Sequence, residues 1–422
     1  MSGRTTKPKD SGSAVRPDSG REPGRDAVRD PGRPGRENER DDAGKATTRT
    51  DKGRRHLSMA GAALRSVALG RPYELTAEVL EVDDDGGSAL YEASLHGGWG
   101  DGAPVLPATD EYVHALLAAT PYRGDRVLGA LPPRFGLATV ELVAINAALA
   151  GVEPRAFPYV IAALEALLVP EWNAAALTTA TSGVFPMLIV NGPARDTHGI
   201  DYRAGCLGGA AGRGSMTIGR AVALCLRNIG GRRPGDTPYT VFGQPARFGL
   251  CFGEWEEHSP WPSLGRRRGF PAHAEVVSVH GGQGVFPFTD ADHEDPRDLA
   301  CSIAKNVASP LNTWFHEPAG GSGQIVLLLN PEWAARLGEV FGTAEDFQTY
   351  VWEHAWQPVD VFPEPGADML HGRGRVDARG RVALAARPDQ FVPVVCGGLG
   401  GLHGAALTSF VQSEMQSAEV VR

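Results

Sequence analysis

Long apolar runs are missing from this sequence of 422 residues. No stretch approaches the roughly 18 uninterrupted apolar residues that a membrane-spanning helix needs, and the first residues lack the apolar segment of a secretory signal. Cysteine is scarce, with five residues, and no two of them stand at Cys-x-x-Cys spacing. This excludes a disulfide scaffold and disfavours a zinc ribbon or a thioredoxin-type couple. We therefore expect a cytoplasmic protein with reduced thiols.

Basic residues are in short supply outside the N-terminal segment. The chain has 41 Lys and Arg against 50 Asp and Glu, and residues 1–55 hold 15 of the basic and 10 of the acidic ones. Residues 56–422 thus carry 26 basic and 40 acidic side chains, a net charge of −14. A protein that neutralises nucleic-acid phosphates needs clustered Lys and Arg, so this acidic body disfavours a nucleic-acid partner.

The N-terminal segment 1–55 has almost no apolar side chains and repeats short units of Arg, Asp, Pro and Gly. Burial of apolar surface cannot offset the entropy of ordering such a segment, so a disordered charged tail is predicted. The rest of the chain is long enough for two domains. We expect an α/β domain over 56–265, with a glycine-rich anion loop and an acidic segment, and a second α/β lobe over 266–422 that ends in a glycine-rich turn.

Local signals predict alternating helices and strands in this body. Helices are expected over 110–119, 139–150, 157–169 and 217–229, with Thr109 and Thr139 as N-caps and Gly151 as a stop signal. Strands are expected over the short apolar runs 128–131, 186–190, 275–280, 325–329 and 391–396. Several of these end at Gly, Asn or Pro, and such strands leading into helices are typical of parallel sheets, which bind ligands beyond their C-terminal strand ends. The expected fold class is α/β, a mostly parallel sheet flanked by helices and divided into two lobes.

Two helical segments, 139–151 and 217–230, resemble each other in sequence. They could mark two duplicated halves, or they could be two ordinary amphipathic helices with the same end signals. Both interpretations stay open from the sequence.

A glycine-rich segment, 205–217, separates a predicted strand from a predicted helix, where backbone N–H groups can hold an anion. Its spacing fails both nucleotide fingerprints, because Ser215 stands at the P-loop lysine position and Thr217 at the third glycine of the dinucleotide motif. A simple flexible connection is the alternative. The residues expected to bind a substrate carboxylate or phosphate are Asn191, Arg213, Ser215, Thr217 and Arg220.

Four ionisable residues crowd into one short segment: Glu254, Glu256, Glu257 and His258. The three glutamates are candidates for general acid–base catalysis. On an extended chain Glu254, Glu256 and His258 would share one face and could bind a divalent metal. A solvated acidic loop is the alternative.

A third candidate is the glycine-rich turn after the last predicted strand, which holds Cys396 and His403. A cysteine at a strand end becomes a nucleophile when its thiolate is stabilised, although a buried cysteine is more often a small apolar filler. Both residues are therefore candidates for catalysis.

Several motifs occur together in a fixed order. They include Ile189-Val-Asn-Gly-Pro193, Glu254-x-Glu-Glu-x-Ser-Pro-Trp261 and Gly397-Gly-x-Gly-Gly401-x-His403. Over residues 109–405 the chain resembles the large domain of a bacterial family associated with a small redox domain, which is named for its selenocysteine/Cys-Gly-Ser-Cys (UGSC) motif. The UGSC motif itself is absent here, Trp255 replaces a usual asparagine, and Leu402 replaces a usual lysine.

The resemblance implies chemistry with a reactive thiol or selenol partner, such as reductive or eliminative cleavage of a small substrate. We therefore expect a lyase or oxidoreductase that acts on a small anionic metabolite, with a separate Cys/Sec redox protein as partner. The alternative is a non-catalytic scaffold or partner subunit that binds a redox protein through the tryptophan-rich acidic segment. Neither a nucleic acid nor a membrane is an expected partner, and self-association of the chain is left open.

Overall fold

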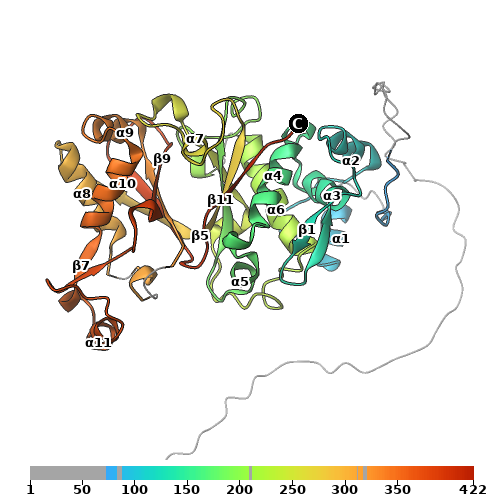
Figure 1. Cartoon of the computed structure of the whole chain (residues 1–422). Helices are drawn as coiled ribbons and strands as arrows, with labels where there is room; N and C mark the ends of the chain where they lie inside the picture. The colour runs from blue at the N-terminus through green and yellow to red at the C-terminus, as the bar shows by residue number, and fades with distance from the viewer. Residues whose placement is uncertain (1–72, 83–87, 209–211, 311, 317–320) are drawn as a thin grey trace, which may run out of the picture. The chain divides into compact units, whose positions relative to one another are not determined.

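The computed structural model describes residues 73–82, 88–208, 212–310, 312–316 and 321–422 (Figure 1). The predicted tail, residues 1–55, lies outside them. One sheet runs through both of the expected lobes, so the boundary expected after residue 265 stays a prediction.

Of the described helices that precede the long strand β5 (Val276–Thr289), four form where local signals predict them, over 110–119, 139–150, 157–169 and 217–229, and three short ones were not predicted. The helices are α1 (Ala89–His96), α2 (Asp110–Leu117), α3 (Val140–Ala150), α4 (Phe157–Leu167), α5 (Ala174–Thr179), α6 (Arg213–Asn228) and α7 (Leu264–Arg267), with a hairpin of β1 (Val127–Leu131) and β2 (Gly136–Thr139) between α2 and α3. The predicted N-caps are confirmed, because the Thr109 and Thr139 hydroxyls accept backbone N–H groups of the first turns of α2 and α3. Gly151 ends α3 with a φ of 82°, which favours glycine.

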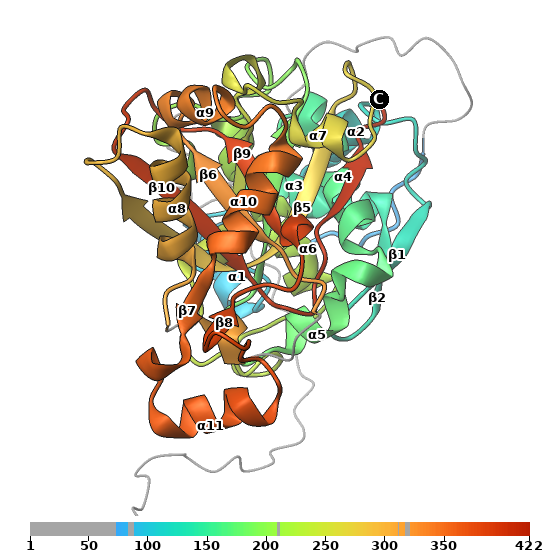
Figure 2. The same cartoon turned by 60° about the vertical axis from the view of Figure 1, so that its left-hand side comes forward.

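The second half of the chain adds a separate group of helices. They are α8 (Pro296–Val307), α9 (Pro331–Gly338), α10 (Ala344–His354) and α11 (Glu364–Gly372). Two short strands, β7 (Trp356–Pro358) and β8 (Arg381–Ala383), pair with each other and lie beside α11, below the main sheet in Figure 2.

The main sheet is mixed, which corrects the expected mostly parallel sheet. Its strands are β3 (Phe185–Asn191), β4 (Leu250–Gly253), β5 (Val276–Thr289), β6 (Ile325–Leu329), β9 (Phe391–Val395), β10 (His403–Ser409) and β11 (Gln416–Glu419). The order is β4-β3-β5-β10-β6-β9, and β11 also pairs with β5. Within the described residues only β3–β4 and β6–β9 are parallel pairs. Gly and Asn end strands of either direction, so these residues could not distinguish the two sheet types.

Two halves of the sheet have the same topology. In the first, β3 lies between β4, to which it is parallel, and β5, to which it is antiparallel; β6 lies in the same way between β9 and β10. The antiparallel pair β5–β10 joins the halves. The similar helical segments 139–151 and 217–230 are not this repeat, because α3 and α6 pack against each other in the first half, where Asn228 donates to Asn146 over 2.8 Å.

The sheet curls, so that inner side chains from both halves share one buried cluster. Ile189 and Phe252 of β3 and β4 belong to it together with Val326, Val394 and Leu407 of β6, β9 and β10. Two further clusters lie outside the sheet, one beneath α3, α4 and α6 and one beneath α8, α9 and α10. The curl brings the ends of β4 and β9, at opposite edges in the strand order, close together.

Candidate functional site

Three segments meet where β4 and β9 end. Trp255, just after β4, donates its backbone N–H to the carbonyl of Val395 over 2.6 Å. Gly397, just after β9, donates to the carbonyl of Tyr202 over 2.9 Å, and Gly253 donates to that of Asp201 over 2.8 Å. These bonds hold the segments 201–208, 253–258 and 395–398 against one another.

A pair of thiols lies at this junction. Cys206 is in a short 3-10 helix (Cys206–Gly208), Cys396 follows β9, and they are 4% and 5% exposed. A hydrogen bond between the thiols, assisted by the backbone N–H groups of Gly397 and Leu207, holds the pKa of Cys206 below its ordinary value. The same hydrogen bond, together with burial, raises the pKa of Cys396. Cys206 is therefore the member of the pair that ionises first, and Cys396 is the proton donor.

A buried carboxyl group lies at the same junction, in the segment 253–258. Glu254 is 1% exposed, and burial raises its pKa, against the opposing effect of Arg267. Its Oε2 accepts the side-chain amide of Asn191 over 2.6 Å and the backbone N–H of Leu264 over 2.7 Å. Its charge contributes to the raised pKa of Cys396. Glu254 can thus hold a proton close to the thiols at a higher pH than an ordinary carboxyl group.

The other two predicted glutamates belong to the same network. The backbone N–H of Gly192 donates to Glu256 Oε1 over 2.7 Å, and Asn191 also donates to that oxygen over 3.1 Å. Arg195, which sequence reasoning missed, is buried and contacts Glu257 Oε1 at 2.5 Å. The structure therefore brings together Asn191 and all three glutamates from the ends of β3 and β4.

The extended geometry expected for the acidic segment is wrong. The strand ends at Gly253, and Glu256–His258 forms a turn of 3-10 helix, so His258 does not continue a common face. Its ring instead packs edge-on against Trp255, with 4.4 Å between ring centroids. No three His, Cys, Asp or Glu side chains in the described part of the chain come together as a metal site. The carboxylates are bound by Asn191, Arg195 and backbone N–H groups.

Of the five residues predicted to bind an anion, Asn191 is the last residue of β3 and the other four lie in helix α6, which begins at Arg213. The guanidinium of Arg213 pairs with Glu153 at 3.0 Å, and that of Arg220 pairs with Asp101 at 2.8 Å. Ser215 Oγ accepts the backbone N–H of Asp201 over 2.8 Å, and the Thr217 hydroxyl donates to the carbonyl of Arg213. Only Ser215 thus reaches the segment that carries Cys206. Residues 209–211 of the expected loop lie outside the described residues.

His403 is separated from Cys396 by the glycine-rich turn. It is the first residue of β10, its side chain is exposed, and its carbonyl accepts the Asn330 side chain over 2.8 Å. The residue that accompanies Cys396 is Cys206, which was not among the site residues predicted from the sequence. A cysteine in each of two glycine-rich segments that follow strands was the available signal, but nothing local pairs the two segments.

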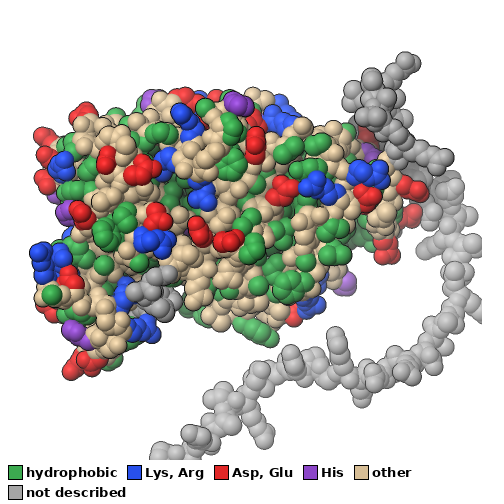
Figure 3. Space-filling model, viewed as in Figure 1, with side chains coloured by type: hydrophobic (Ala, Val, Ile, Leu, Met, Phe, Trp, Pro, Cys, Tyr) green, Lys and Arg blue, Asp and Glu red, His purple; other side chains and the backbone are tan. Residues whose placement is uncertain are grey.

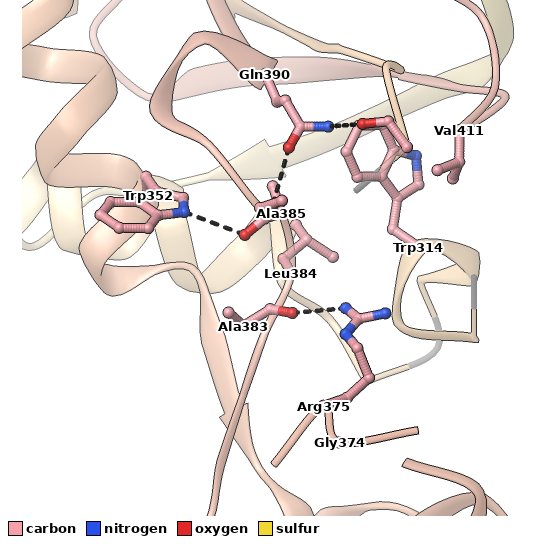
Figure 4. A pocket seen from close by; sticks show the side chains of 11 residues that line it. Trp314, Trp352, Gly374, Arg375, Ala383, Leu384, Ala385, Gln390 and Val411 are labelled. Atoms are coloured by element: carbon pink, nitrogen blue, oxygen red, sulfur yellow. Dashed lines mark hydrogen bonds between the residues drawn. The ribbon is translucent and has the colours of Figure 1, made fainter. Parts of the chain in front are cut away.

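Two cavities lie elsewhere in the structure. A cavity of about 240 Å³ lies among Trp314, Trp352, Arg375 and Gln390 in the second half, where Trp352 and Arg375 donate to the carbonyls of Ala385 and Ala383 (Figure 4). Another, of about 280 Å³, lies beside Phe286 of β5. Neither is lined by the thiol pair or the glutamates.

Comparisons with protein-family models and with curated proteins give no match. Among the described residues no single helix is both long and apolar enough to cross a membrane. One bent pair, Pro154–Leu167 with Pro170–Thr179 at 77°, meets these criteria jointly, and the α4 part of it is buried in the protein. On the face shown in Figure 3, acidic and basic side chains are interspersed.

Proposed function

We propose that the protein is an enzyme that acts on a small metabolite through Cys206, Cys396 and Glu254. The observation that supports this most is that two thiols from different segments share one buried cluster at a junction that also carries a buried carboxyl group. A thiolate is the nucleophilic form of cysteine, and a carboxyl group that keeps its proton can protonate a leaving group. Bond cleavage in a small substrate needs both.

Each residue around the pair has a distinct role in this proposal. Cys206 attacks the substrate, and Glu254 supplies the proton. Asn191 is a positioning residue, because its amide fixes the carboxyl group of Glu254. An anionic substrate would be held by backbone N–H groups of the glycine-rich segments 204–208 and 397–401, since Arg213 and Arg220 already have acidic partners.

The alternative, a scaffold that docks a redox protein through the tryptophan-rich acidic segment, has less support. Trp261 is 5% exposed and donates its indole N–H to the carbonyl of Phe341, so it is not available to a partner surface. Trp255 packs edge-on against Tyr202 and His258. A catalytic role for this segment therefore fits the burial better than docking does.

The test is a search for substrate turnover. The protein is reduced with dithiothreitol, freed of it by gel filtration and incubated at high concentration with a bacterial metabolite extract, and consumed and formed compounds are followed by mass spectrometry. We expect at least one compound to be consumed by the wild-type protein and by Cys301→Ser, but not by Cys206→Ser, and far more slowly by Glu254→Gln. Cys301 is a matched control because it is a partly exposed cysteine on α8. Equal metabolite profiles for all four proteins would refute the enzymatic function.

A further inference from the structure

The arrangement of the thiol pair allows a reaction that a single nucleophilic cysteine cannot perform. Cys206 and Cys396 belong to one buried cluster, and the segments that carry them are in backbone contact, so a small movement would bring the two thiols to the S–S bond length. The backbone hydrogen bond from Gly397 to Tyr202 already ties the two segments together. A side chain at Gly398 would be in tight contact with Ala204, 3.2 Å from its Cβ, so glycine permits the close approach.

The other three cysteines are placed differently. Cys225, in α6, and Cys251, in β4, are buried in apolar surroundings, and burial raises the pKa of each thiol far above its ordinary value. Cys301 is partly exposed on α8 in the second half. Cys206 differs from these three, because its thiol pKa is lowered and a second thiol lies beside it.

We propose that Cys206 and Cys396 cycle between dithiol and disulfide, that the substrate is a small disulfide, and that a separate dithiol protein restores the reduced pair. This inference rests on the proposed function and selects its reductive form. Two electrons leave the cysteine pair in each turnover and enter the substrate.

The steps balance as follows. The Cys206 thiolate attacks one sulfur of the substrate R–S–S–R′, forms a mixed disulfide with R–S, and expels R′–S⁻, which takes the proton of Glu254. The Glu254 carboxylate then accepts the proton of Cys396, and the Cys396 thiolate attacks the sulfur of Cys206. R–S⁻ leaves and is protonated by Glu254, and the Cys206–Cys396 disulfide remains. A dithiol reductant supplies two electrons and two protons: it restores the Cys206 thiolate and the Cys396 thiol, returns the proton of Glu254, and is itself oxidised to a disulfide.

The two segments that carry the thiols are rich in glycine and largely exposed. Ala204, Gly205 and Gly208 are exposed, as are Leu399 and Gly400 of the other segment. Few side chains therefore stand between solvent and the sulfur atoms. A small disulfide can approach Cys206 between these two segments more readily than a folded protein can. This is why the proposed substrate is small.

Oxidation of the pair can be tested without knowledge of the natural substrate. The native full-length chain is equilibrated with mixtures of oxidised and reduced glutathione, quenched with acid, alkylated, and analysed as intact protein and as peptides. We expect the wild-type protein and Cys301→Ser to lose two thiols and to give a peptide that links Cys206 and Cys396, which dithiothreitol reverses. We expect Cys396→Ser to stop at a glutathione adduct on Cys206, because its resolving thiol is missing.

Two results would overturn the inference: free Cys206 and Cys396 in native protein at every glutathione ratio, or adducts confined to Cys301. A denatured, reoxidised sample shows that the linked peptide is detectable. The linked peptide together with equal metabolite profiles in the turnover test would refute the enzymatic function alone. Release of both halves of the substrate as free thiols by Cys396→Ser would retain the enzyme and reject the disulfide cycle.

Discussion

The side-chain amide of Asn191 donates a hydrogen bond of 2.6 Å to the buried carboxyl group of Glu254. Asn191 is the last residue of β3 and Glu254 directly follows β4, each one residue beyond the last parallel pair of these strands, Val190 and Gly253. In the second half of the sheet, Asn330 and Cys396 follow β6 and β9 after the equivalent pair Leu329 and Val395. The repeated topology thus places an acid at the end of one half and a thiol at the equivalent position of the other, and the curl of the sheet brings them together.

Glu254→Gln should stabilise the protein at alkaline pH. The folded state keeps the proton of Glu254 after the unfolded chain has lost it, so wild-type stability falls as pH rises from the ordinary value of 4.5 through the raised pKa. Above that pH range, each pKa unit by which Glu254 differs between the folded and the unfolded state destabilises the folded protein by about 1.4 kcal/mol. Glutamine keeps the shape without the charge. Urea unfolding at pH 4 and pH 8 should show the variant's advantage mainly at pH 8.

Glu353→Gln is the matched control, because Glu353 is exposed on α10. It should change the unfolding free energy by no more than about 0.5 kcal/mol at either pH. If Glu254→Gln is as neutral as this control at pH 8, Glu254 is ionised in the folded protein at no cost, and its proposed role as proton donor is lost.

Asn191→Asp should destabilise the protein by about 2–4 kcal/mol at pH 8, because it adds a carboxylate next to Glu254 and Glu256 and removes their shared donor. The loss should shrink as the pH is lowered and the carboxylates are protonated. Asn330→Asp is the control at the equivalent position. Aspartate can still cap α9 there, so the loss should be smaller and nearly independent of pH. Equal losses would mean that charge at Asn191 is not the cause.

The thiol pair predicts a difference in alkylation. The Cys206 thiolate is stabilised by the hydrogen bond from Cys396, so the pKa of Cys206 should rise in Cys396→Ala and be lowered again in Cys396→Ser, whose hydroxyl can donate. At pH 7, alkylation of Cys206 by iodoacetamide, measured by peptide mass spectrometry, should be several-fold slower in Cys396→Ala than in Cys396→Ser. The same rate in both variants would show that the hydrogen bond does not control ionisation.

Local elements of this fold could be predicted from sequence because their signals are local. Thr109, Thr139 and Gly151 bound α2 and α3 as expected. The direction and length of β5 could not be predicted. Gly281 and Gly282 indicated a strand end, yet the strand continues through them. Glycine is needed there because a side chain at Gly282 would overlap Met187 of the neighbouring strand.

The candidate site also contains residues that could be predicted from the sequence and residues that could not. The glutamates and Cys396 were recognised by their density and their place after strands. Cys206 and Arg195 were missed, because the contacts that give them a role join segments far apart in the chain. The contact between Cys206 and Cys396 depends on the curl of a mixed sheet, which no single segment encodes.

The last prediction concerns the beginning of α6, which supports the segment that carries Cys206. Gly214 packs so closely on the carbonyl of His198 that an added Cβ would overlap this backbone atom, and Ser215 donates its backbone N–H to the carbonyl of Gly199 over 3.1 Å. Gly214→Ala should therefore cost about 1–3 kcal/mol of unfolding free energy. Gly208→Ala, where an added Cβ would meet no atom of the described residues within 4 Å, is the control and should stay within about 1 kcal/mol of the wild type. The residues just after His198 accept backbone hydrogen bonds from this region: Gly199 from Ser215, and Asp201 from Gly253. A shift of His198 should therefore displace the segment that carries Cys206 and slow formation of the Cys206–Cys396 disulfide. Gly214→Ala with wild-type stability and an unchanged rate of disulfide formation would show that this packing does not position Cys206.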